Sequence, residues 1–288
     1  MGQSHWQRAL GKRRRAYYLH RMALRLDDRA VIALTGPEAR GFLQGLITND
    51  IAALAPGKAL YAALLAPQGK ILFDFLLAEG DGAILMDCAA PSAQALTKRL
   101  KMYRLRARVE IEPREQLAVL AEPGGPLPEA GINFADPRHD GLGHRSIGAR
   151  AEMPAGAAPG ETYLMHRLDL GIPEGADFGS DRIFALDGGL DELHAVSFTK
   201  GCYVGQELTA RMKHRGTARK RLLTLRGETA LPAPGTALRA EGREIGEITS
   251  VYGTRGFALV RLDRLEEAGA AAIDADGARV SVIRPSWI

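Results

Sequence analysis

Residues 197–221 read S-F-T-K-G-C-Y-V-G-Q-E-L-T-A-R-M-K-H-R-G-T-A-R-K-R, and this stretch holds one of the two cysteines of the chain. Cys202 lies between Gly201 and Gly205, and a dense run of cations begins a few residues later. A thiol reacts as its thiolate, which nearby cations or a helix N-terminus favour. Most residues from about Gly205 to His214 form helices readily, so we expect Cys202 just ahead of a short helix. The stretch predicts either a reactive thiol or a buried turn cysteine beside a solvated basic helix.

The octapeptide around this cysteine resembles the signature of the YgfZ family, the folate-binding relatives of the glycine-cleavage T-protein. Its residues are Lys200, Gly201, Cys202, Tyr203, Val204, Gly205, Gln206 and Glu207. Three further stretches resemble family landmarks: Phe42 to Asp50 its first helix, Ala66 to Leu72 its early hairpin, and Arg167 with Gly171-Ile172-Pro173 its mid-chain motif. The resemblance extends from about Ala23 to Ile288.

The resemblance implies an α+β fold, with a T-protein-like ring of three subdomains around a central folate-binding hole. The pattern of the residues agrees with it. Strands and helices alternate in the first half of the chain, which favours a ferredoxin-like part. After Arg221, short strands separated by glycine and proline turns are typical of a small β-barrel.

Three segments are expected from these patterns. Residues 1–22 would be a basic extension without fixed structure, 23–215 a T-protein-like folate-binding region of two subdomains, and 216–288 the C-terminal β-barrel. Within the second segment, Asp177 to Glu192 is acidic and glycine-rich, and we expect it to form a surface loop.

The basic extension leaves three interpretations open. Residues 1–22 carry six lysines and arginines and no acid. They could be a disordered arm or an over-long start, an arginine-rich targeting peptide, or a nucleic-acid-binding arm.

Composition limits the class of protein. Hydrophobic residues make up 46% and charged residues 25% of the 288 residues, which is ordinary for a soluble globular chain. No apolar run is long enough to span a membrane, so we expect no membrane contact. Two cysteines without a signal peptide point to a reducing compartment, and we expect a cytoplasmic location.

The cysteine count also bears on metals. Two thiolates cannot supply the four that usually hold an iron–sulfur cluster, so a cluster would need a second subunit, a partner protein or a small thiol. We therefore expect no metal site built from this chain alone.

Two residues are candidates for chemistry. Lys200 and the cations after Cys202 would favour a thiolate there without a general base. The T-protein hairpin carries two adjacent aspartates, whereas here Phe73 replaces the first and only Asp74 remains. A half-buried carboxylate at Asp74 could orient a folate amine or act as general base; alternatively, it is an ordinary polar residue of a strand. No P-loop, dinucleotide fingerprint, H-E-x-x-H or G-x-S-x-G motif occurs.

The resemblance implies tetrahydrofolate or a derivative as the cofactor. We assign Tyr61, Asp74 and Tyr203 to the folate rings by their positions in the chain. Arg211 is assigned to the carboxylate tail, which an arginine can pair with two parallel hydrogen bonds.

These observations favour a folate-binding accessory protein for assembly or repair of iron–sulfur clusters. Its partners would be folate, iron–sulfur client or assembly proteins, including enzymes that modify tRNA, and tRNA itself. One alternative is a tetrahydrofolate-dependent aminomethyltransferase or methyltransferase, so whether the chain is an enzyme stays open. A second alternative is a tRNA-binding protein that uses the cations from Arg211 to Arg221.

Overall fold

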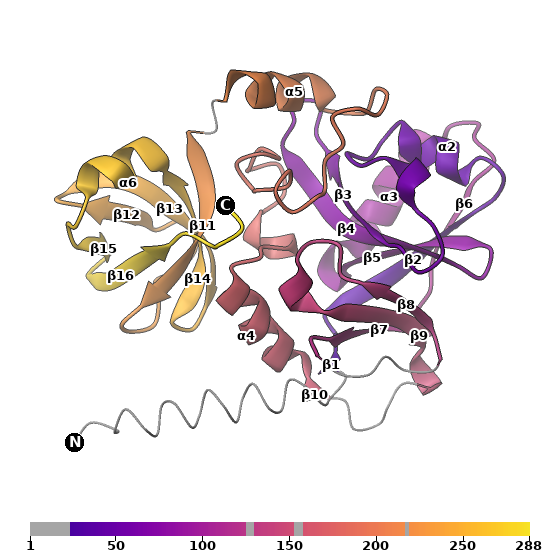
Figure 1. Cartoon of the computed structure of the whole chain (residues 1–288), viewed down its shortest axis with the longest axis horizontal. Coiled ribbons are helices and arrows are strands. Elements are labelled where there is room, and N and C mark those ends of the chain that lie inside the picture. Colours follow the sequence, from indigo (N-terminus) through magenta and orange to yellow (C-terminus); the bar gives the residue numbers. More distant parts are fainter. Residues whose placement is uncertain (1–23, 125–129, 153–157, 217–218) are drawn as a thin grey trace.

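The computed structural model describes residues 24–124, 130–152, 158–216 and 219–288, and the predicted basic extension lies outside these ranges. Figure 1 shows three parts: a sheet covered by α2 and α3, a second sheet beside α4, and a barrel that carries α6. The segment between α4 and α5 lies between these parts. This arrangement confirms the predicted α+β fold with a C-terminal barrel.

The first sheet is antiparallel throughout. Its strands, in spatial order, are β3 (Leu60–Leu65), β4 (Ile71–Gly80), β5 (Ala83–Ala89), β2 (Arg29–Thr35) and β6 (Glu110–Pro113). Along β3, Tyr61 and Ala63 pack against one hydrophobic cluster while Ala62 and Leu64 pack against another. Side chains alternate between the two faces of a strand, so this apolar run can be buried on both sides.

Helices cover one face of this sheet. They are α2 (Ala39–Gln44) and α3 (Ala93–Arg104), which starts after the short 3-10 helix η2 (Ala90–Ser92). Leu43, Leu96 and Leu100 are buried in the cluster under these helices. The spacing of the last two, four residues apart, places them on one helix face.

The second sheet packs toward the other face. Its order is β10 (Ala158–Pro159), β1 (Leu24–Arg25), β7 (Leu117–Glu122), β9 (His144–Ala149) and β8 (Ile132–Ala135), with β1 and β10 parallel. Val119 and Ile147 share one hydrophobic cluster with Tyr61 of the first sheet. Helix α4 (Gly160–Leu170) lies between this sheet and the barrel.

The C-terminal part is a closed six-stranded barrel. Its strands, in spatial order, are β11 (Lys220–Gly227), β14 (Arg255–Arg261), β13 (Arg243–Tyr252), β12 (Ala237–Ala240), β15 (Ile273–Ala275) and β16 (Ala278–Ile283). Helix α6 (Leu262–Ala268) follows β14. The barrel has its own hydrophobic cluster, which includes Leu223, Ile248 and Val260. The predicted domain boundary between residues 215 and 216 stays a prediction.

One expectation about the fold is wrong. The segment from Asp177 to Glu192 was predicted to be a surface loop, yet Phe178, Ile183, Leu186 and Leu190 are all buried. These apolar side chains recur every three to five residues, and Phe178, Ile183 and Leu190 share one hydrophobic cluster with residues of both sheets and of the barrel, among them Tyr61, Val119 and Phe257. The many glycine and acidic residues of this segment therefore led to the wrong prediction, because its apolar residues are part of the core.

Candidate functional site

Cys202 lies on an exposed loop directly before α5 (Gln206–Arg215). The helix begins within about one residue of its predicted start. Gly205 is its N-cap residue and has a φ of 84°, a conformation that glycine adopts without strain. The Cys202 thiol is thus at the surface rather than buried in the turn.

Lys200 anchors this loop to the segment that follows α2. Its ammonium nitrogen, Nζ, lies 2.7 Å from the carbonyl oxygens of Gln44 and Ile47 and 3.0 Å from that of Asn49. Burial lowers the pKa of Lys200 to about 8, an effect that the carboxylate of Asp50 partly opposes. We predicted that Lys200 would favour the Cys202 thiolate, but the residue is only 7% exposed and its ammonium donates to the three carbonyls.

Gly205 anchors the other end of the loop to the hairpin before β4. A Cβ atom built on Gly205 would lie 2.6 Å from the carbonyl oxygen of Ala66 and 3.2 Å from the Cα atom of Gly69. Such distances leave no room for a side chain at residue 205, so the two backbones can approach only because that residue is glycine.

Further hydrogen bonds join the same segments. The Ser197 amide donates to the Thr48 carbonyl at 3.0 Å, and the Thr48 hydroxyl donates to the Ala195 carbonyl at 2.6 Å. The three stretches that resemble family landmarks around residues 42–50, 66–72 and 200–207 therefore meet at one place. Together they hold the Cys202 loop from both sides.

Tyr61 and Asp74 form a separate buried pair. The Tyr61 hydroxyl donates to one carboxylate oxygen of Asp74 at 3.1 Å, and the Gly175 amide donates to the other at 2.8 Å. Burial raises the pKa of Asp74, while the nearby guanidinium of Arg29 acts in the opposite direction. The pair combines a phenol and a carboxyl group; Tyr61 is fully buried, whereas Asp74 is 5% exposed and borders a cavity.

A buried network of ion pairs surrounds this pair, and sequence reasoning missed it. It joins four arginines to four carboxylates: Arg29, Arg138, Arg145 and Arg167 with Asp87, Asp136, Glu174 and Asp177. The guanidinium of Arg138 lies over the Tyr61 ring, 5.6 Å from its centroid. The only signal in the sequence is a single charge inside an apolar strand, as with Asp87 in β5.

The network is balanced in charge without Asp74. Burial alone would raise the pKa of Asp136, but Arg138 and Arg145 outweigh it and lower this pKa to about 2. Buried charges remain stable only when they are paired and hydrogen-bonded. The four arginines and four carboxylates satisfy that condition, and Asp74 is left as an additional carboxyl group beside them.

The other two residues assigned to folate lie elsewhere. Tyr203 is buried under the ammonium of Lys200, 5.1 Å from the ring centroid, and lines a cavity of about 200 Å³ with Phe198. Arg211 is 51% exposed on α5 and forms an ion pair with Glu207 at 2.6 Å. The structure thus brings together only Tyr61 and Asp74.

The cations after Cys202 are also partly neutralised. Lys213 pairs with Asp191 at 3.0 Å, and Arg221 pairs with Glu192. Arg215 and Arg219 are exposed. The basic surface predicted from Arg211 to Arg221 is therefore smaller than the sequence indicates.

Cys88 lies at the border of a second cavity. This cavity of about 320 Å³ is lined by Phe73, Asp74, Cys88 and Gly175, among others. Burial raises the pKa of the Cys88 thiol to about 12. Cys88 is thus a core residue of β5, as a cysteine at the end of an apolar strand suggests.

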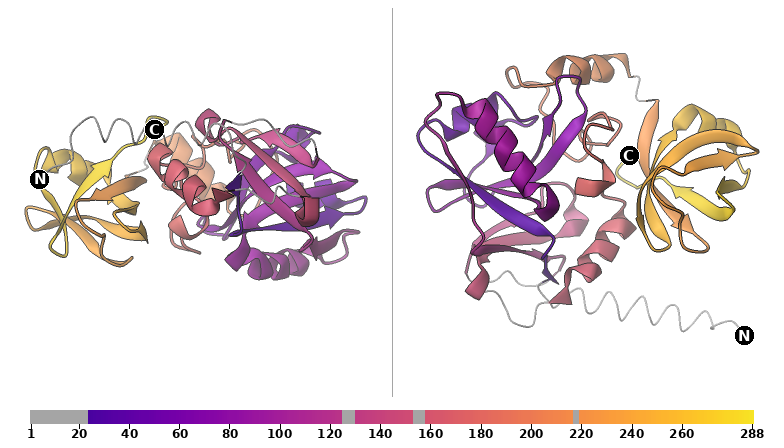
Figure 2. Two further views of the ribbon diagram at one scale, coloured as in Figure 1. Left: turned by 90° about the horizontal axis from the view of Figure 1, so that it is seen from below. Right: turned by 180° about the vertical axis from the view of Figure 1, so that it is seen from behind.

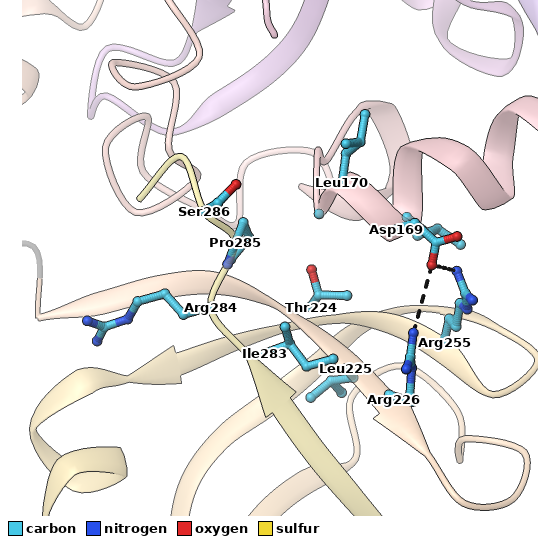
Figure 3. Close-up of a pocket in the computed structure, with 12 residues that line it drawn as sticks. Asp169, Leu170, Thr224, Leu225, Arg226, Arg255, Ile283, Arg284, Pro285 and Ser286 are labelled. Carbon is cyan, nitrogen blue, oxygen red and sulfur yellow. Dashed lines mark hydrogen bonds and ion pairs between the residues drawn. The ribbon is translucent and has the colours of Figure 1, made fainter. Parts of the chain in front are cut away.

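A third cavity, of about 270 Å³, separates the end of α4 from the barrel (Figure 3). Asp169 of α4 forms ion pairs there with Arg226 and Arg255 of the barrel. The Trp287 indole nitrogen donates to the Leu170 carbonyl at 3.0 Å. The cavity contains none of the predicted site residues, and its contacts hold the barrel against α4.

Within the four described ranges, no group of three or more histidine, cysteine, aspartate or glutamate side chains could hold a metal ion. None of the helices in those ranges is both long and apolar enough to cross a membrane.

The chain is similar to known iron–sulfur cluster assembly factors. The human "Iron-sulfur cluster assembly factor IBA57, mitochondrial" is 37% identical over 91% of this chain and 84% of its own length. The mouse protein of the same name is 35% identical over 84% of this chain and 78% of its own length. The family profile of the CAF17 C-terminal β-barrel domain matches residues 219–288.

Among solved structures, the glycine cleavage system aminomethyltransferase T of Bartonella henselae has a similar fold. The TM-score is 0.71 at 19% identity, and the match covers 96% of this chain and 89% of that one. This similarity confirms the T-protein-like fold.

The comparisons also correct one expectation. The human and mouse relatives are both named mitochondrial. The prediction of a cytoplasmic location, which rested on two cysteines and the lack of an apolar signal peptide, is therefore wrong. A reducing environment, which is all that the cysteine count indicates, does not identify the compartment.

Proposed function

Because this chain belongs to the IBA57 family of iron–sulfur cluster assembly factors, we propose that it takes part in iron–sulfur cluster assembly through the thiol of Cys202. The observation that carries the proposal is the position of this thiol. It is exposed on a loop that Lys200 fixes on one side and Gly205 on the other.

The chemistry follows from the ligands available. Cys202 would lose its proton, and its sulfur would take one coordination position on an iron atom of the cluster, which is the cargo. Thiolates are the ligands that clusters prefer, and four are usual. Since the described residues contain no group of three or more side chains that could hold a metal ion, the remaining positions would be filled by a partner protein or a small thiol. The fixed loop would hold the Cys202 sulfur in place to coordinate iron together with the other ligands.

The test is complementation of cells that lack this protein. The activity of iron–sulfur enzymes is measured with the wild-type chain, with Cys202→Ser and with Cys88→Ser as the matched control. We expect Cys202→Ser to fail, because oxygen is a hard ligand for iron, and Cys88→Ser to complement. A fully active Cys202→Ser variant would exclude the proposal.

We further propose that reduced folate is the ligand served by Tyr61 and Asp74. A phenol beside a carboxyl group suits the polar edge of a pterin ring, and the 320 Å³ cavity at Asp74 is large enough for that ring. Folate carries one-carbon units when bound. Asp74 would accept an N–H of the ring or hold a proton there, and Tyr61 would orient the carboxyl group.

Calorimetry with tetrahydrofolate tests this second proposal. At a concentration a hundredfold above the dissociation constant, binding should stabilise the chain by about 2.7 kcal/mol. If saturating tetrahydrofolate gives no heat of binding and no thermal shift, folate binding is excluded. That result would leave the role of Cys202 intact.

Two alanine variants in the same complementation assay distinguish the assembly role from the alternative of a folate-dependent aminomethyltransferase or methyltransferase. Complementation that survives Asp74→Ala but not Cys202→Ala supports the assembly role. Loss with Asp74→Ala and retention with Cys202→Ala supports the transferase.

The alternative of a tRNA-binding protein rests on the exposed cations Arg215, Arg219 and Lys220. Binding through phosphates weakens steeply with salt. The tRNA-binding alternative would be excluded by an RNA affinity that does not change with salt. An affinity that does not change with Arg215→Ala would exclude it as well.

A further inference from the structure

The C-terminal end of α3 exposes apolar side chains that the described fold does not use. Met102 is 63% exposed, and Leu105, the residue that ends the helix, is 87% exposed. Only Phe198 and Ile283 are comparable among the large hydrophobic residues of the described ranges, and both are less exposed. Met102 belongs to the last turn of α3 and Leu105 directly follows the helix, so both exposed side chains lie at the same helix end.

Leu105 also has an unusual backbone conformation. Its φ is 46° and its ψ −105°, a combination that a bulky residue with a Cβ atom rarely adopts. Such a conformation is strained, and residues of this kind cluster at functional sites. Glycine would adopt it without strain. An exposed leucine at this position therefore adds nothing evident to the stability of the isolated chain.

An open groove of about 1070 Å³ runs beside this helix end. Its lining includes the small side chains Ala30, Ala90 and Ala93 together with Met102 and Pro113. Because several lining residues are small, the groove has room for side chains of another molecule.

The helix side of the groove is positively charged. Helix α3 contains no acidic residue. The side chains of Lys98, Arg99, Lys101 and Arg106 are exposed and form no ion pair within the ranges that the structure describes. Cations are attracted to acidic groups over a distance of about 10 Å at 0.1 M salt.

We propose that this surface, made of Lys98, Lys101, Met102 and Leu105 with the adjoining groove, docks an acidic amphipathic segment of a partner protein. Apolar side chains of the segment would enter the groove and cover Leu105, and its carboxylates would face the lysines. Exposed apolar anchors inside a charged rim are the usual composition of such a site.

The shape and charges favour a protein over other partners. A nucleic acid has no use for exposed leucine and methionine side chains. A flat anionic membrane surface could contact the exposed cations but would not fill the adjoining groove.

The site is separate from Cys202. Helix α3 lies across the face of the first sheet that is seen from behind, whereas α5 lies along another edge of the molecule (Figure 2). A partner bound at α3 would therefore leave the Cys202 loop open.

A peptide selection on the full chain tests the proposal. Peptides displayed on phage are selected against the wild-type protein, and the enriched ones are synthesised and their affinity measured by fluorescence anisotropy. We expect acidic amphipathic sequences. Leu105→Gly should weaken their binding at least tenfold while leaving the melting temperature unchanged or higher, because glycine relieves the strained backbone.

Charge reversal gives the second arm of the experiment. Lys98→Glu with Lys101→Glu should abolish binding of the selected peptides. The control with the same net charge, Lys58→Glu with Arg239→Glu, alters exposed cations elsewhere and should not change it. Selected peptides that are basic, or whose binding survives Leu105→Gly, would overturn the proposal. Binding to phosphatidylserine vesicles that depends on Leu105, without an acidic peptide ligand, would instead assign the surface to membranes and equally overturn it.

Discussion

The backbone of Gly205 lies against that of Gly69, so the loop that carries Cys202 is in direct contact with the hairpin before β4. A Cβ atom on Gly205 would come within 3.2 Å of the Cα atom of Gly69. These residues are 136 positions apart in the sequence (205 − 69). Their contact connects the candidate thiol to the sheet that holds Asp74.

Gly205→Ala should therefore destabilise the chain. The added methyl group would overlap the Ala66 carbonyl, and the φ of 84° is unfavourable for alanine. We expect a loss of about 2 kcal/mol or more in the free energy of unfolding, measured with urea. Gly201→Ala is the matched control, since no atom lies within 4 Å of its Cβ position, and it should stay within about 0.5 kcal/mol.

Lys200→Met should loosen the Cys202 loop. Three backbone carbonyls would lose their donor, and a net hydrogen bond contributes about 1 kcal/mol. We expect a loss of about 2 kcal/mol and faster amide hydrogen exchange in residues 197–205. Unchanged exchange there would show that Lys200 does not anchor the loop.

The stability difference between wild type and Lys200→Met should depend on pH. The folded pKa of Lys200 is about 8, below the roughly 10.4 of an unfolded lysine. Between these values the unfolded chain binds more protons, so the wild type gains stability as pH rises through this window. Lys200→Met lacks this gain. A difference that is constant from pH 7 to 10 would contradict the lowered pKa.

Much of this architecture follows from local sequence. The barrel strands were predicted because glycine and proline turns separate short apolar runs after Arg221. The short strand β15 (Ile273–Ala275) and helix α6 (Leu262–Ala268) were missed. Three residues are too few for an alternating pattern to stand out, and the seven-residue helix has only three apolar residues, Leu262, Leu265 and Ala268, which are too few to show a clear helical period.

The site was less predictable for a physical reason. The signature residues around Cys202 are adjacent in sequence and could be recognised together. The network of Arg29, Arg138, Arg145 and Arg167 depends on distant partners: Arg29 is 58 positions from Asp87 and 145 (174 − 29) from Glu174, and spacing in a sequence does not reveal such pairs. The ion pair of Arg211 with Glu207, by contrast, joins residues four apart on α5, and this spacing could have been read from the sequence.

Asp74→Asn should change how stability depends on pH. Burial raises the pKa of Asp74, so between about 3.9, the value of an unfolded aspartate, and the folded pKa the native state binds more protons. The wild type therefore loses stability as pH rises through this window, and Asn, which cannot titrate, does not. Urea titrations at several pH values measure the difference. Asp74→Leu is the control: it leaves the Tyr61 hydroxyl and the Gly175 amide without their partner and should destabilise at every pH.

Arg145→Met should be among the most destabilising single changes. The guanidinium binds Asp87 at 2.6 Å and Asp136 at 2.9 Å, and all three groups are buried. Removing one partner of a buried ion pair typically costs about 3–5 kcal/mol. Arg150→Met, with an arginine that is 50% exposed, should cost less than about 1 kcal/mol. Equal melting temperatures for the two variants would show that the network contributes little.

Alkylation should distinguish the two cysteines. Cys202 is exposed, whereas Cys88 is buried and burial raises its pKa to about 12. Because only the thiolate attacks iodoacetamide, the fraction of Cys88 that can react at pH 7.5 is negligible even if the reagent reaches it. We expect peptide mapping after brief labelling to find the adduct on Cys202 alone, and on both residues once the chain is unfolded in urea. The Lys200→Met variant should keep Cys202 reactive, since the ammonium serves the loop rather than the thiol. Equal labelling of both cysteines in the folded protein would remove the basis for treating Cys202 as the reactive centre.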